Sequence, residues 1–117
     1  MPPSISAGDI FRLRVDFQDD PEGFKKRPVV VLAVSDEEFI VMAAQITSVG
    51  PNENPTYHDQ YKFPILNWQK SGLDKPSWVK THPDNLLRIE INKLNNCIGQ
   101  IHRDDLQRLI EQLESDI

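Results

Sequence analysis

The sequence predicts a mainly β fold, a small antiparallel β-barrel that is capped by one C-terminal helix. Three observations lead to this prediction. Apolar and polar residues alternate near the N-terminus, which is the period of a strand with one buried face. A short, continuous, β-branched run follows, as expected for a strand buried on both faces. The end of the chain changes to helical spacing, so strands come first and one helix comes last.

The first predicted strand covers residues 11–17. Its outward face carries Arg12 and Arg14, and its inward face is apolar: Phe11, Leu13, Val15 and Phe17. Residues 18–26 are polar and contain Pro21 and Gly23, which predicts a loop.

The central strand is predicted over residues 28–34, with Pro28 at its first position, where a missing N–H is tolerated. A turn at residues 35–38 leads into a third strand over residues 39–47, so the two strands form a hairpin. The long polar loop that follows, residues 48–60, is a candidate functional segment because long loops in compact domains often are.

The remaining elements are short. Residues 67–72 predict one helical turn that ends at Gly72. Extended segments are predicted at residues 61–65, 77–81, 86–91 and 97–101, the last of which closes the sheet. Asp104 and Asp105 suit the first turn of the C-terminal helix, where the helix dipole favours anions. One stripe of this helix is apolar: Leu106, Leu109, Ile110, Leu113 and Ile117.

Composition predicts a single globular domain over residues 1–117. The lone cysteine, Cys97, favours a reducing compartment, and residues 1–6 do not resemble a signal peptide, so we expect a cytoplasmic protein. No apolar run reaches the length of a membrane span. The net charge of −5 argues mildly against a nucleic-acid partner, although a local basic patch on an acidic protein is compatible with one.

Residue spacing gives little support to metal or nucleophilic catalysis. The histidines His58, His82 and His102 are scattered, and there is no cysteine pair, so we predict no metal site and no cofactor. Cys97 falls in a predicted buried strand, which favours an inert core thiol over a nucleophile. The five glycines are dispersed and form no phosphate loop.

A cationic group remains as the candidate site. Lys25, Lys26 and Arg27 precede the central strand, and the planar guanidinium of Arg27 suits bidentate phosphate recognition. Thr47 and Ser48 end the third strand and offer hydroxyl donors. Both features also have a purely structural explanation. The cations can be a solvated charge run at a strand end, and Thr47 and Ser48 can simply be the end of a strand and the start of a turn. Trp68 and Trp78 likewise fit core or interface packing better than base stacking.

Six short motifs occur in order along nearly the whole chain: Gly8-Asp9-Ile10, Lys26-Arg27-Pro28-Val29-Val30-Val31-Leu32, Ile46-Thr47-Ser48, Gly72-Leu73, Lys75-Pro76-Ser77-Trp78-Val79, and Ile98-Gly99 before an acidic helix start. Taken together, they resemble the PemK/MazF toxins of type II toxin–antitoxin systems, relatives of the CcdB fold.

The resemblance implies an SH3-like antiparallel β-barrel, a homodimer, and a metal-independent endoribonuclease (an mRNA interferase) inhibited by an antitoxin protein. It implies that Arg27 and Thr47 are the catalytic pair acting on single-stranded RNA, and that Ser48 matches a serine of the site. Lys26, Arg14 and His58 are further candidates for RNA binding. His58 is also the candidate general base, unless it is a solvated loop histidine.

Two alternatives stay open at this stage. The chain departs from the Asp/Glu-Gln-x-Arg stretch of many MazF proteins at residues 81–88, so no role is transferred to Arg88. A catalytically silent barrel that acts through binding, or a gyrase-targeting inhibitor like the CcdB relatives, would also use this fold. The presence of Arg27 with Thr47 disfavours the gyrase inhibitor.

Overall fold

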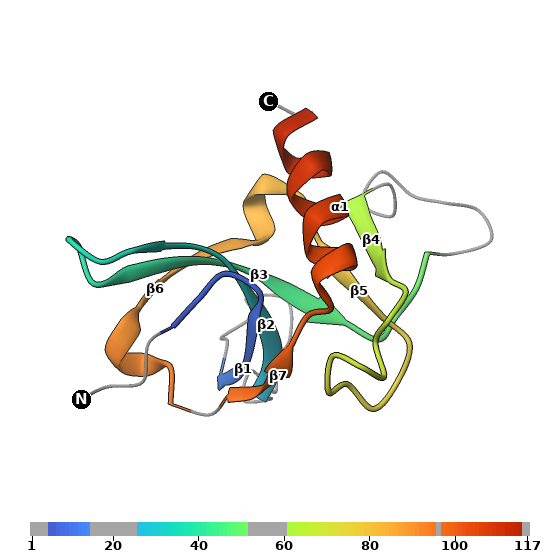
Figure 1. Ribbon diagram of the computed structural model, residues 1–117, viewed down its shortest axis with the longest axis horizontal. Helices are drawn as coiled ribbons and strands as arrows, with labels where there is room; N and C mark the ends of the chain where they lie inside the picture. The colour runs from blue at the N-terminus through green and yellow to red at the C-terminus, as the bar shows by residue number, and fades with distance from the viewer. Residues whose placement is uncertain (1–4, 15–25, 52–60, 96, 116–117) are drawn as a thin grey trace.

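A computed structural model describes residues 5–14, 26–51, 61–95 and 97–115, and it gives no side-chain description for Arg14, Lys26 or Asp84. Figure 1 shows the elements, which are mainly strands followed by one helix. The strands are β1 (Asp9–Arg14), β2 (Lys26–Ser35), β3 (Ile40–Thr47), β4 (Lys62–Ile65), β5 (Ser77–Lys80), β6 (Leu86–Glu90) and β7 (Cys97–Gln100). Two 3-10 turns, η2 (Pro83–Asn85) and η3 (Ile91–Lys93), flank β6, and helix α1 covers Arg103–Ser115.

The strands form an antiparallel sheet in the order β4-β5-β3-β2-β1-β7, with β6 also paired to β3. Strand β3 changes its neighbour along its length, because Ala44 lies opposite Leu86 of β6 whereas Ile46 lies opposite Val79 of β5. Among the described strands, β4 and β7 stand at the two ends of the order and do not pair with each other. The predicted mainly β fold with a C-terminal helix is confirmed, but the sheet is open, so closure into a barrel by residues 97–101 is not.

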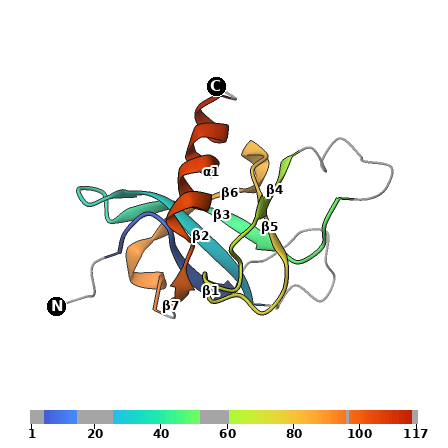
Figure 2. The ribbon, with the colours of Figure 1, turned by 45° about the vertical axis from the view of Figure 1, so that its right-hand side comes forward.

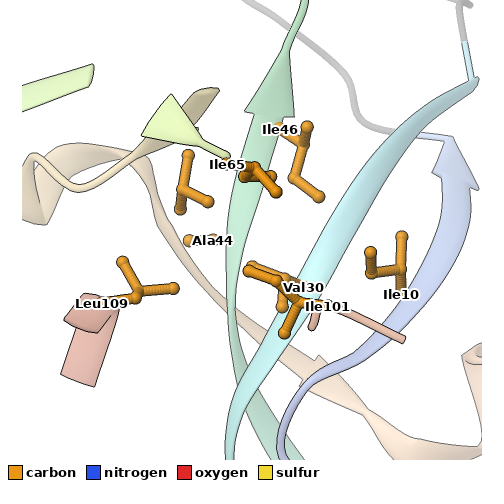
Figure 3. Close-up of a cluster of buried hydrophobic side chains, with 8 residues drawn as sticks. Ile10, Val30, Ala44, Ile46, Ile65, Ile101 and Leu109 are labelled. Atoms are coloured by element: carbon orange, nitrogen blue, oxygen red, sulfur yellow. The ribbon is translucent and has the colours of Figure 1, made fainter. Parts of the chain in front are cut away.

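The central strand is buried on both faces at Val29, Val30 and Val31, as its continuous apolar run predicts, whereas residues 32–34 are half-buried or exposed. Val30 contributes to the core under helix α1, and Figure 3 shows it among Ile10, Ala44, Ile46, Ile65, Ile101 and Leu109. Val29 and Val31 point to the other face and join a second cluster with Phe11, Val41, Ala43, Ile89 and Leu94. We refer to these as the helix side and the open side of the sheet.

Helix α1 stands beside β4 and β5 in both Figure 1 and Figure 2, while the tip of the β2–β3 hairpin projects away from it. Leu109 is fully buried, and Leu106 and Leu113 pack against the same cluster, so the predicted apolar stripe is confirmed for these positions. Ile117 lies outside the described residues. Within the described ranges, no helix is long and apolar enough to cross a membrane.

Three local predictions have different outcomes. The first strand starts at Asp9, and Val15 and Phe17 lie outside the described residues, although Phe11 is buried and Arg12 is exposed as predicted. Residues 67–72 form one helical turn, as predicted: the N–H of Ser71 donates to the carbonyl of Asn67 at 3.1 Å, and Gly72 ends the turn with φ 86°. The prediction that Cys97 is buried is wrong. Its side chain is exposed, because β7 is an edge strand of the sheet.

Candidate functional site

A groove of about 520 Å³ opens where several strand ends meet. Because neighbouring strands are antiparallel, four strand ends meet at one end of the sheet: the end of β1, the start of β2, the end of β3 and the start of β5. Loop 73–75 completes the wall. The lining residues are Arg12, Arg27, Pro28, Ile46, Thr47, Ser48, Leu73, Asp74, Lys75 and Ser77.

Strand register brings Arg27 and Thr47 together on the open side of the sheet. Val29 of β2 lies opposite Gln45 of β3, and two further residues in this register place Arg27 opposite Thr47. Directly opposed residues of neighbouring strands point to the same face. The two residues proposed as a catalytic pair thus share one groove, although their chemical role stays a prediction.

The hydroxyl of Thr47 is held in a defined position. Thr47 is buried, and its Oγ1 accepts a hydrogen bond of 3.1 Å from the backbone N–H of Val49. A threonine hydroxyl that accepts one bond still has its own proton to donate. The neighbouring Ser48 is exposed and also lines the groove. The turn that ends β3 therefore orients one hydroxyl and leaves a second at the rim.

The other predicted site residues are placed only in part. Arg14 and Lys26 lie opposite each other where β1 and β2 meet, close to the groove, but their side chains are not described. His58 lies outside the described residues. Arg12 is exposed and lines the groove, in agreement with its predicted outward direction.

Sequence reasoning missed two cations, Lys62 and Lys80, which lie directly opposite each other on β4 and β5. Burial lowers the pKa of Lys80, and the positive charges of Arg27 and Lys62 lower it further. The ammonium of Lys62 also donates to the carbonyl of Gly50 at 3.3 Å. The sequence gives no signal for this group, because it is assembled by the register of β4 against β5 and by the place of β5 beside β3.

The tryptophans have packing roles. Trp78 lies opposite Thr47, and its ring packs on the backbone at Gly50, where a Cβ would come within 2.8 Å of the indole. Trp68 is half-buried against the core on the helix side. Both placements agree with the preference for packing over base stacking.

Arg88 does not enter the groove. It lies on β6 and pairs with Glu38 at 3.1 Å, near the tip of the β2–β3 hairpin. Both side chains are exposed, so this pair contributes little stability. The Arg88 position therefore gives no support for a role at the site of Arg27.

In the part of the chain that the structure describes, no group of three or more His, Cys, Asp or Glu side chains is arranged to hold a metal ion. The groove offers mainly cations and hydroxyl groups: two guanidinium groups, a lysine ammonium, three hydroxyls and the carboxylate of Asp74. Guanidinium and hydroxyl donors together suit a phosphate group that gains negative charge during a reaction.

Comparison with known proteins gives a family and a fold. A family model described as "PemK-like, MazF-like toxin of type II toxin-antitoxin system" matches residues 6–115. Among solved structures, the chain is similar to the Mycobacterium tuberculosis toxin MazF-mt6, with 23% sequence identity and a TM-score of 0.64. The match covers 92% of this chain and 93% of the other. No curated protein sequence matches significantly.

Proposed function

The chain belongs to the PemK-like, MazF-like toxin family of type II toxin–antitoxin systems, and from this premise we propose that it is an endoribonuclease that cuts single-stranded RNA without a metal ion. The observation that supports the proposal most directly is that Arg27 and Thr47 line one groove from neighbouring strands. The chain acts as one domain, and the groove is its catalytic centre.

The proposed reaction uses the RNA's own 2′-hydroxyl as the nucleophile. Its oxygen attacks the adjacent phosphorus while its proton passes to a base, and the bond from phosphorus to the 5′-oxygen breaks as that oxygen takes up a proton. The products carry a 2′,3′-cyclic phosphate and a 5′-hydroxyl. Arg27 stabilises the negative charge that builds up on the phosphorane, and the Thr47 hydroxyl donates to a non-bridging oxygen.

The arrangement around Arg27 favours this role on electrostatic grounds. Arg27 is half-buried, and its Nε atom is fully enclosed, so its guanidinium has restricted freedom. A fixed cation in a partly desolvated groove stabilises developing charge more strongly than a mobile one in water, because it need not reorganise during the reaction.

The same family membership supports the proposed partners. We propose that the protein works in the cytoplasm as a homodimer that an antitoxin neutralises. Exposed apolar side chains at Val49 and Leu66, 64% and 66% exposed, are suited to an interface. Trp68 does not add to this exposed apolar surface, because it is half-buried against the protein's own core.

A second candidate is a barrel-like protein that binds partners without cutting RNA. The departure at residues 81–88 and the net charge of −5 favour it. Incubation of purified protein with long single-stranded RNA in excess EDTA separates the two functions. Cleavage supports the nuclease, and its absence on RNAs of varied sequence supports the binding protein.

The decisive variant is Arg27→Ala, for which we expect cleavage to fall on the order of 10²–10³-fold with a cooperative melting curve retained. Arg103→Ala is the matched control, since Arg103 is an exposed arginine at the start of α1. Thr47→Ser, which keeps the hydroxyl, should retain more activity than Thr47→Val. Wild-type cleavage by Arg27→Ala would exclude the proposed centre, and a requirement for a divalent metal would exclude the proposed mechanism.

A further inference from the structure

The face of the sheet to which Arg27 and Thr47 point, the open side, continues onto β5 and β4. Thr47 lies opposite Trp78, and two residues further along β5 the side chain of Lys80 points to the same face. The intervening residue Val79 points to the helix side and joins the core there. Lys80 in turn lies opposite Lys62. A single face therefore carries Arg27, Thr47, Lys80 and Lys62 across four strands.

Charge as well as register connects these residues. After burial, the positive charges of Arg27 and Lys62 both lower the pKa of Lys80, so Lys80 lies close enough to each of them to interact electrostatically. Like charges that are directly opposed on neighbouring strands destabilise a sheet, and a half-buried lysine adds a desolvation cost. A bound polyanion such as the phosphate backbone of RNA offsets both of these costs.

We propose that Lys62 and Lys80 form a second phosphate subsite, which binds the RNA backbone phosphate next to the one held at Arg27. This inference rests on the proposed function. It sets the direction of the RNA strand, which runs across the strands from β2 towards β4 on the open side of the sheet.

Lysine side chains suit a subsite that binds the RNA backbone without taking part in its cleavage. A lysine ammonium acts as a point charge with three rotatable donors, so it accepts a phosphate in many orientations. Phosphate contacts of this kind fix the position of a nucleic acid without reading its sequence. The subsite therefore adds affinity and register for any RNA sequence, whereas Arg27 and Thr47 act on the phosphate that reacts.

Binding tests the subsite separately from cleavage. The probe is a random-sequence 2′-O-methyl RNA octamer, which has no free 2′-hydroxyl and is not cut, titrated at several salt concentrations. The double variant Lys62→Gln/Lys80→Gln should bind about tenfold more weakly. The slope of its log affinity against log salt should be shallower by about 0.7, the value for one phosphate of a single strand.

The matched control is Lys70→Gln/Lys93→Gln, which removes the same charge from two exposed lysines that lie outside β2, β3, β4 and β5. Lys62→Arg/Lys80→Arg should restore the slope, which separates loss of charge from loss of fold. If the Gln pair and its control give equal slopes, the subsite is excluded.

The outcomes of the two proposals remain distinguishable. Wild-type cleavage of RNA with an unchanged slope in the Gln pair would overturn the subsite alone. A reduced slope in a protein that cuts no RNA would support the subsite and overturn the nuclease. A wild type that binds no octamer would overturn both.

Discussion

Two charged regions of this protein show the same direction of pKa change with opposite consequences. At the start of helix α1, the pKa of the buried Asp105 is lowered. On the open side of the sheet, the pKa of Lys80 is also lowered. For a carboxylate the change means that the folded protein favours the charged form, whereas for an ammonium it means that the charged form is disfavoured. The Asp105 region therefore stabilises the fold through its charged form, whereas the surroundings of Lys80 disfavour its charged form.

Asp105 is surrounded by donors. Burial by itself would raise its pKa, but hydrogen bonds from the backbone N–H and side chain of Asn67, from Arg108 and from the Leu66 N–H outweigh burial and lower it. The two backbone bonds measure 2.8 Å from Asn67 and 3.3 Å from Leu66. Arg108 also lies over the ring of Phe63, 5.1 Å from its centroid, so helix α1 is fixed to both β4 and the turn that follows.

Lys80 has the opposite surroundings. Burial and two neighbouring cations all act against its charge. A lysine whose pKa is lowered by burial and by neighbouring cations marks a candidate functional site. The comparison teaches that the sign of the charge, and not the direction of the pKa change, separates the structural site from the proposed functional one.

The largest expected effect comes from breaking the structural region. Asp105→Ala removes the acceptor for two backbone N–H groups and leaves Arg108 without its carboxylate. We expect a loss of about 3 kcal/mol in the free energy of unfolding. For a domain of this size that corresponds to a fall of roughly 10 °C in the melting temperature, measured by circular dichroism.

Asp104→Ala is the matched control, because Asp104 is the exposed neighbour in the same first turn. Its loss should cost less than about 1 kcal/mol. Equal melting temperatures for the two variants would show that the buried carboxylate does not hold the helix.

A smaller effect follows from acid. Because the pKa of Asp105 is lower in the folded protein than its ordinary value of 3.8, the unfolded chain binds its proton more readily. The stabilisation is complete above about pH 4 and is lost as the pH falls through the folded pKa. Urea unfolding at a series of pH values should therefore show the difference between wild type and Asp105→Asn shrinking below about pH 4. A constant difference down to pH 2 would contradict the assignment.

The fold could be read largely from periodicity. The buried part of strand β2 shows as a continuous apolar run, and the apolar stripe of helix α1 shows as a period of 3.6, because each pattern fixes which side chains meet the core. The sequence could not predict that the sheet is open, because closure into a barrel depends on whether the two edge strands pair with each other. The exposure of Cys97 was missed for the same reason: an edge strand and a central strand have similar residues.

The candidate site divides in the same way. Arg27 and Thr47 lie in recognisable motifs, and the resemblance to a family singled them out. Lys62 and Lys80 lie in no motif, and only the pairing of β4 with β5 and of β5 with β3 brings them towards Arg27. The position of helix α1 against the rest of the fold could not be predicted either, because the hydrogen bonds from residues 66 and 67 to Asp105 span nearly 40 positions of sequence. Gly99 marks another long-range contact, between β7 and the turn at residues 67–72, because a Cβ at this position would overlap the carbonyl oxygen of Ser71.

The smallest predicted effect is a gain in stability from Lys80→Met. Methionine keeps an apolar stem of similar length and removes the charge that burial, Arg27 and Lys62 disfavour. Since the folded pKa lies below 10.5, the folded protein bears a cost at neutral pH that fades as the pH rises through the folded pKa towards the unfolded one. Lys80→Met should therefore raise the free energy of unfolding by less than about 1 kcal/mol at pH 7, and the advantage should shrink towards pH 11. Urea unfolding measures it, with the exposed Lys70→Met as control. A variant less stable than wild type at pH 7 would show that Lys80 supports the fold, and the contrast with Asp105 would then fail.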